Sequence, residues 1–186
     1  EPQVLKDLLE DAQGWLDEAP IGDEVGYFPD GATTDLEKAI EEVGATVKDV
    51  MSMEEINAGK KALNDAIDAL QAKLIYPEEG IYMIQSTTDP EAGAFEQYVG
   101  NLWSGNTQLV WGGNDEELEA SSHPGYFWKL TKNEDGTYSL YNFGTGNYLQ
   151  AQPEETSPVG ADGAKSSFKL RSARQGGSFN IVFGEN

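Results

Sequence analysis

Aromatic and amide side chains are the residues of this 186-residue chain best suited to binding a ligand. Trp103 lies in the loop-like segment GNLWSGN, Trp111 ends the run TQLVW, and Tyr148 follows the amides Asn142 and Asn147. Aromatic faces stack on the apolar faces of sugar rings, and amides hydrogen-bond the neighbouring hydroxyl groups. These five residues form the candidate binding set for a glycan, although Trp111 fits a core position equally well.

Catalysis has little support in the sequence. The single histidine, His123, lies in the turn-like segment SSHPG, and no second histidine or nucleophile motif completes a catalytic constellation. The chain also lacks cysteine, which excludes thiol chemistry and disulfides. We therefore expect a protein that is not an enzyme and needs no cofactor.

Two acidic segments have some of the character of cation sites. Residues 114–119 hold four carboxylates within six positions, but without the ordered alternation and glycine of a calcium loop. Residues 133–136 (NEDG) are explained by a hairpin turn. Solvated loops are the better interpretation of both, so no metal site is predicted.

The net charge of the chain disfavours some classes of binding partner. It carries 12 basic and 33 acidic residues, a formal net charge of −21, and both halves are acidic. Such a surface repels phosphate backbones and anionic membranes, so nucleic acid is not an expected partner. No apolar run is long enough for a signal peptide or a membrane span, so membrane insertion is not expected. The opening Glu1-Pro2 favours a mature or excised part of a longer protein with further domains.

Helical periodicity dominates the first 75 residues. Apolar residues recur at helical spacing over 2–19, 34–47 and 52–74, and Trp15 lies on the apolar stripe of the first segment. Thr34 with Glu37, and Ser52 with Glu55, have the spacing of capping boxes. Three helices joined by short loops predict an up-down-up bundle over residues 1–75.

This first part resembles the FIVAR-type three-helix modules over residues 4–72. The similarity lies in the segments LLEDAQGWLDEA, VGYFPDGATTDLEKAIEEV and SMEEINAGKKALNDAIDAL. The resemblance implies a spacer or adaptor in a secreted or cell-surface, multi-domain bacterial protein of a kind that often acts on glycans. It brings no catalytic residues.

After Tyr76-Pro77 the pattern changes to short β-prone runs separated by turn residues, and Asp135-Gly136 is a strong hairpin signal. The predicted strands are 81–85, 108–111, 126–131, 137–142, 148–151, 167–171 and 178–183.

The β-prone part also repeats itself, since residues 125–151 are echoed by 166–186 and, more loosely, by a copy starting at Gly80. Three such units predict a β-trefoil, with Trp128 and Phe168 as equivalent core positions. The aligned pairs are Trp128 with Phe168, Leu130 with Leu170, Tyr138 with Phe179, and Leu140 with Ile181.

Residues 80–186 resemble the ricin-B-like β-trefoil family. Trp128 and Phe168 take the aromatic place of the family's Gln-x-Trp element, from which the Gln is absent here. The resemblance implies sugar binding near Asn142, Asn147 and Tyr148, although the family's sugar-binding Asp has no evident counterpart. The third copy stops at Asn186, with about nine of the family's twelve strands, so an incomplete third repeat is expected.

Together these patterns predict an α+β protein of two domains, a three-helix bundle (1–75) and a β-trefoil-like domain (76–186). The expected function is that of a non-catalytic accessory module in a secreted or cell-surface bacterial protein. The β domain would bind a carbohydrate, with the helices as a spacer. The alternative is a structural or protein-interaction module without a glycan site. An exposed aromatic platform beside amides favours the first, and complete burial of the aromatic residues favours the second.

Overall fold

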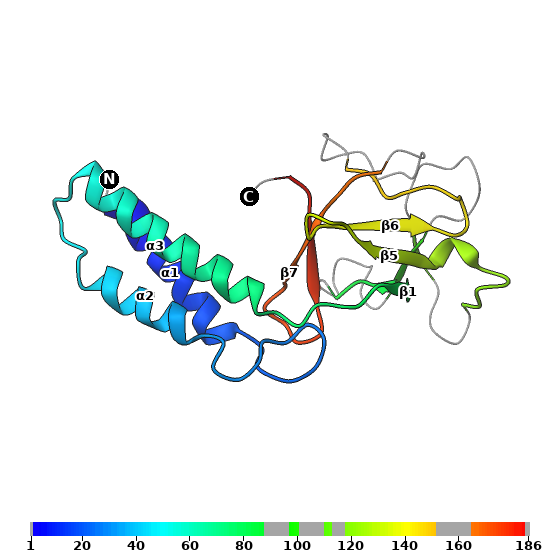
Figure 1. Ribbon diagram of the computed structural model, residues 1–186, viewed down its shortest axis with the longest axis horizontal. Coiled ribbons are helices and arrows are strands. Elements are labelled where there is room, and N and C mark those ends of the chain that lie inside the picture. Colours follow the sequence, from blue (N-terminus) through cyan, green and yellow to red (C-terminus); the bar gives the residue numbers. More distant parts are fainter. Residues whose placement is uncertain (1, 88–96, 101–109, 113–117, 152–164, 185–186) are drawn as a thin grey trace. The chain divides into compact units, whose positions relative to one another are not determined.

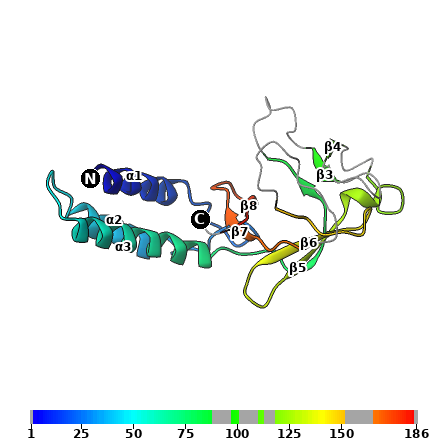
Figure 2. The ribbon, with the colours of Figure 1, turned by 90° about the horizontal axis from the view of Figure 1, so that it is seen from above.

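The computed structural model describes residues 2–87, 97–100, 110–112, 118–151 and 165–184, without the side chains of Val110 and Trp111 (Figures 1 and 2). These residues contain three α-helices and eight short strands, which confirms the mixed α+β class. The chain groups into two compact units. The helical unit comprises Glu1–Pro77 and Arg171–Asn180, and the β unit comprises Glu78–Leu170 and Ile181–Asn186. The division at residue 75 and the β-trefoil stay predictions.

The helical unit contains the three expected helices, α1 (Pro2–Glu18), α2 (Thr34–Gly44) and α3 (Met53–Ala72). Figure 1 shows α2 returning antiparallel to α1 and α3, with the three side by side. Their apolar stripes meet in one core, because residues at helical spacing share a face. Trp15, Ile40 and Val47 are half-buried against it. The fully or nearly fully buried helical residues of this core are Leu5, Ala12, Leu36, Val43, Leu63, Ala66, Ile67 and Leu70.

The capping box at the start of α3 is confirmed. The Glu55 amide donates to Ser52 Oγ at 3.2 Å, and the Ser52 amide donates to Glu55 Oε2 at 2.7 Å. Hydrogen bonds from Lys48 and from the Ser52 amide and hydroxyl lower the pKa of Glu55 from 4.5 to about 2. The box therefore satisfies two amides that the first helical turn leaves without partners.

The capping box predicted for Thr34 and Glu37 is wrong. The cap position of α2 is Thr33, whose backbone is helical (φ −81°, ψ −8°) and whose side chain makes no capping bond. Thr34 lies inside the helix, and its hydroxyl donates to the Gly31 carbonyl at 3.0 Å. The tight turn before α2 already has helical geometry, so the extended cap residue that a capping box requires is missing.

The connection between α1 and α2 is ordered by its own backbone bonds. The Phe28 amide donates to Pro20 O at 2.8 Å, and Phe28 is fully buried in the helical core. Gly26 and Tyr27 exchange backbone bonds with Ile75, 2.8 and 2.9 Å long. This segment therefore closes one end of the helical core.

The C-terminal turn, Arg171–Asn180, belongs to the helical unit although it lies about a hundred residues from α3 in sequence. The Ser172 amide donates to Gln71 Oε1 at 3.0 Å, and Arg171 pairs with Asp68 at 2.6 Å. The ring of Phe179 lies 6.4 Å from that of Tyr76 and joins the helical core. The turn is thus anchored on α3 and on the residues that follow it.

Arg174 fixes the same turn to α1. Its guanidinium pairs with Asp11 at 2.6 Å and Glu18 at 3.3 Å, and lies 4.1 Å from the centre of the Trp15 ring. Its backbone has φ +60°, a left-handed conformation that costs a non-glycine residue energy. The contacts with α1 offset that cost.

The β unit contains two small antiparallel sheets. One has the order β1 (Gly80–Tyr82), β5 (Trp128–Lys132), β6 (Tyr138–Asn142). The other has the order β2 (Ile84–Gln85), β3 (Tyr98–Gly100), β4 (Val110–Gly112). The predicted strand 81–85 is therefore divided at Met83 between two sheets, and β3 was not predicted.

One hairpin of the β unit follows the turn that was predicted for it. β5 and β6 pair across Asp135-Gly136, with Gly136 at φ +82°, which confirms the predicted hairpin. A two-stranded sheet joins β7 (Lys169–Ser172) and β8 (Phe179–Val182). In place of the predicted strand 148–151 the structure has an isolated bridge between Tyr148 and Tyr141.

The first pair of repeat positions is confirmed in the core. Trp128 and Phe168 are each 1% exposed, and the Trp128 indole donates to Val99 O at 3.0 Å. Leu130 and Leu170 are also buried.

The last aligned pair differs in its surroundings. Leu140 is 3% exposed, whereas Ile181 is 38% exposed. Alignment in the repeat therefore does not bring equal burial at this pair, because β8 leaves exposed a face that β6 buries.

Candidate ligand-binding site

The structure describes some of the five predicted site residues and not others. Trp103 lies outside the described residues. Trp111 lies on β4 opposite Val99, and its side chain is also outside the description. Asn142, Asn147 and Tyr148 are brought together by the turn that follows β6.

Asn142 holds this turn from inside. It is fully buried; its Nδ2 donates to Gly125 O at 2.8 Å, and its Oδ1 accepts from the amides of Gly144 and Thr145 at 2.9 and 3.1 Å. Its backbone amide donates to Asn147 O at 2.8 Å. Both ends of the side-chain amide are thus engaged within the protein, so Asn142 positions the turn rather than gripping a ligand.

Three aromatic side chains gather on the turn, and we name Tyr141, Phe143 and Tyr148 the aromatic turn. The rings of Tyr141 and Tyr148 meet edge to face with centres 5.3 Å apart, and those of Tyr141 and Phe143 with centres 5.7 Å apart. Phe143 is 42% exposed, and the other two are half-buried. Asn147, also half-buried, precedes Tyr148 directly.

Tyr141 and Phe143 were missed by sequence reasoning, but a signal was present. Ser139 and Leu140 are both buried, but from Leu140 on the buried Leu140 and Asn142 alternate with the half-buried Tyr141 and the exposed Phe143, which follows β6. Assigning Leu140 to the core therefore directs Tyr141 and Phe143 to the opposite face, away from Asn142.

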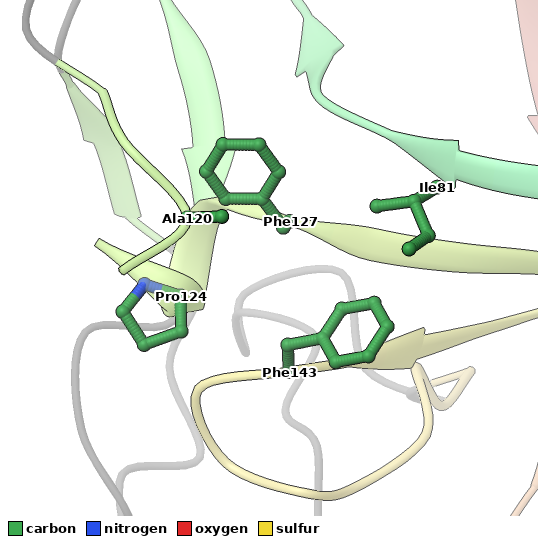
Figure 3. Close-up of a pocket in the computed structure, with 5 residues that line it drawn as sticks. All are labelled: Ile81, Ala120, Pro124, Phe127 and Phe143. Atoms are coloured by element: carbon green, nitrogen blue, oxygen red, sulfur yellow. The ribbon is translucent and has the colours of Figure 1, made fainter. Parts of the chain in front are cut away.

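An apolar cleft of about 300 Å³ adjoins the aromatic turn. Figure 3 shows Phe127 and Phe143 on opposite sides of it, with Ile81 at one end and Ala120 and Pro124 at the other. The Phe143 amide donates to Phe127 O at 3.1 Å, which holds the two aromatic walls together. These five residues define the cleft, and all of their side chains are hydrocarbon.

His123 lies in the turn between two of the cleft residues. Its amide donates to Glu119 O at 2.6 Å, its Nδ1 accepts from the Glu119 amide at 3.4 Å, and its carbonyl accepts from the Tyr126 amide at 3.1 Å. This network confirms His123 as a turn residue. With Nδ1 accepting, the neutral ring carries its proton on Nε2, which can donate.

A second, shallow hollow is lined by residues 131–135, Lys165 and Ser167. Its polar groups bond to one another: Lys165 Nζ donates to Asn133 Oδ1 at 2.7 Å, and Asp135 Oδ1 accepts from the amide and hydroxyl of Thr137. The bonds from Thr137 lower the pKa of Asp135 below 3.8. These bonds are those of a stabilised hairpin turn, in keeping with the predicted interpretation of residues 133–136.

The other acidic segment lies mostly outside the description. Residues 114–117 are not described, Leu118 is buried and Glu119 is exposed. Among the described residues, no three His, Asp or Glu side chains gather in a group that could hold a metal ion.

Comparison with known proteins adds no assignment: no family model, no curated protein and no solved structure matches this chain. Within the described ranges, no helix combines the length and apolar character needed to cross a membrane. Inference about function therefore starts from the aromatic turn and the cleft.

Proposed function

We propose that the β unit is a non-catalytic carbohydrate-binding module of a secreted or cell-surface bacterial protein, with the helices as its spacer. One observation carries the proposal: Tyr141, Phe143 and Tyr148 lie in ring contact on a single turn, beside the amide of Asn147. Aromatic faces for stacking and an amide for hydroxyl groups are the chemistry that a neutral sugar requires.

The turn is built to hold its aromatic side chains in place. Asn142 donates two hydrogen bonds, to Gly125 O and Asn147 O, and accepts three from backbone amides of the turn. These bonds fix the backbone of the turn, and Gly146 takes the positive φ of +73° that closes it. Such preorganisation reduces the entropy lost on binding. Asn142 thus keeps a role in the proposed site as a positioning residue, and the ligand contacts fall to the aromatic turn, Asn147 and the predicted Trp103 and Trp111.

Charge supports a neutral ligand. With a net charge of −21, the chain repels acidic polysaccharides at long range. A ligand on the aromatic turn stays partly exposed, because only Tyr141 and Tyr148 are half-buried and Phe143 is open. We therefore expect weak binding, in which several sugar residues or several modules together give useful affinity.

The second candidate is a protein-interaction module. The apolar cleft favours it, because a hydrocarbon-lined hollow with Ile81 63% exposed and Phe143 42% exposed is also suited to an apolar side chain of a partner. The two functions differ in their dependence on the half-buried Tyr148, which contacts Tyr141 and is not part of the cleft.

Titration calorimetry against neutral polysaccharides tests the proposal. The variants Phe143→Ala, Tyr148→Ala and Trp103→Ala are compared with Tyr82→Ala as the aromatic control. Tyr82 is 37% exposed and follows Ile81 on β1, so its side chain lies on the opposite face of that strand. We expect binding to fall at least tenfold in Phe143→Ala and Tyr148→Ala and to persist in Tyr82→Ala.

Two results would contradict this assignment. Binding that survives both Phe143→Ala and Tyr148→Ala removes the aromatic turn from the site. No binding of the wild-type chain to any neutral polysaccharide supports the protein-interaction function instead.

A further inference from the structure

We propose that the preferred ligand is a neutral glycan bearing an aromatic substituent, with the sugar on the aromatic turn and the substituent in the apolar cleft. This inference rests on the proposed function and specifies its ligand class. Its starting point is Phe143, which belongs to both features: it meets Tyr141 in the aromatic turn and forms one wall of the cleft. A ligand on the first is therefore adjacent to the second, at the Phe143 wall of the cleft that Figure 3 shows.

The lining of the cleft selects the chemistry of the substituent. Ile81, Ala120, Pro124, Phe127 and Phe143 present hydrocarbon side chains and no hydrogen-bonding side-chain group. An acetamido or hydroxyl group placed there would find no hydrogen-bonding side chain among these five residues. A hydrocarbon ring loses nothing and gains edge or face contact with two phenylalanine rings.

The size of the cleft is sufficient for an aromatic ring. A volume of about 300 Å³ lies at the lower end of the range for small-molecule pockets. Ala120 matters here because its methyl is the smallest side chain in the lining, and a larger one would project into the space that a ring would use.

The test compares methyl and phenyl β-D-glucopyranoside, and the same two galactosides, by calorimetry with the whole chain. For whichever sugar binds, we expect the phenyl glycoside to bind roughly tenfold more tightly, since it removes a further apolar ring from water. N-acetylated methyl glycosides should show no such gain. Ala120→Leu should abolish the phenyl preference and leave methyl glycoside binding unchanged, and Ser121→Leu, beside the cleft lining, should change neither. Both residues are exposed, so the variants should have the same melting temperature as the wild type.

The outcomes separate this inference from the proposed function. Equal affinity for methyl and phenyl glycosides overturns the aromatic ligand class and leaves glycan binding in place. A phenyl preference that persists in Ala120→Leu overturns the assignment to the cleft. If no glycoside binds, this inference falls, and the polysaccharide titration decides whether the proposed function falls with it. Phenol alone, bound by the wild type and not by Ala120→Leu, supports the cleft as an aromatic subsite.

Discussion

The hairpins β5–β6 and β7–β8 arise from similar stretches of sequence, yet their turns have different surroundings. The aligned residues are forty positions apart before the turn and forty-one after it, so the second turn is one residue longer. The first turn is exposed, and a side-chain carbon added at Gly136 would touch nothing. In the second, a carbon added at Gly176 would come within 2.3 Å of the Tyr27 ring.

The turn between β7 and β8, which has one residue more, therefore has a different role from the turn between β5 and β6. The longer turn includes Arg174 in a left-handed conformation, and from there its guanidinium reaches Asp11, Glu18 and the face of Trp15. In the first hairpin, Asp135 instead bonds within its own turn, to Thr137. Strands β5 and β7 are thus similar, but the turns that follow them differ in role. The turn after β5 closes a hairpin, and the turn after β7 completes the helical unit.

The largest effect is expected at the buried aromatic position that the two hairpins share, Trp128 and Phe168. Trp128→Ala and Phe168→Ala each remove a large side chain that is 1% exposed, so each should lower the free energy of unfolding by about 3–5 kcal/mol. Chemical denaturation measures both losses, with the exposed Phe143→Ala as the control. Near-wild-type stability of both variants would refute the equivalence of the two positions.

The second test addresses the strands after the turns, where the hairpins differ. Leu140→Ala should cost about 2–5 kcal/mol because Leu140 is 3% exposed. Ile181→Ala should cost less than about 1 kcal/mol because Ile181 is 38% exposed. Similar losses in the two denaturation curves would show that β8 buries its face as β6 does.

Arg174→Ala tests the docking of the second turn. The variant loses two ion pairs and the contact with Trp15 but keeps the left-handed backbone, so we expect a loss of about 1–2 kcal/mol that shrinks in high salt. Arg174→Gly should lose less, because glycine adopts positive φ without strain. Lys38→Ala, which breaks one exposed pair with Glu42, is the control. An Arg174→Ala loss no larger than that of Lys38→Ala would show that the turn is not held by these contacts.

The smallest effect concerns the first turn and depends on pH. Folding lowers the pKa of Asp135 below 3.8, chiefly through the bond from the Thr137 hydroxyl. Its contribution to stability is therefore complete above pH 3.8 and is lost as the pH falls through the lowered pKa. Unfolding curves of wild type and Asp135→Ala should differ at neutral pH and converge in acid. A constant difference across that range would contradict the role given to the carboxylate.

The helices were predictable because their stripes follow a simple period, whereas caps and connections depend on geometry that spacing does not specify. Ser52 and Thr34 have the same relation to a glutamate three residues on, but only Ser52 has the extended backbone (φ −70°, ψ 158°) that lets its side chain cap. Strand β3 went unpredicted because three residues, Tyr98–Gly100, are too few to establish an alternation.

The turn that carries the proposed site contains residues predicted from the sequence together with residues that were not. Asn142 and Tyr148 were predicted, yet the amide of Asn142 faces inward, and the neighbouring Tyr141 and Phe143 supply most of the aromatic surface. A family resemblance compares residue types along the chain and does not indicate whether a side chain points into the core. That direction follows from the alternation of side chains along a strand. The cleft could not be predicted at all, since Ile81 and Phe143 are brought together by the pairing of β1, β5 and β6.

The C-terminal turn also sets the order in which the protein can be completed during synthesis. Asp11 and Arg174 are 163 positions apart, so the helices leave the ribosome long before their last partner exists. At elongation rates of roughly 5–20 residues per second, synthesis of that length of chain takes on the order of 8–33 seconds. The nascent helices spend that interval without Arg171, Arg174 and Phe179, and the chain crosses between the units three times. No single proteolytic cut can therefore release the helical unit with all of its contacts intact.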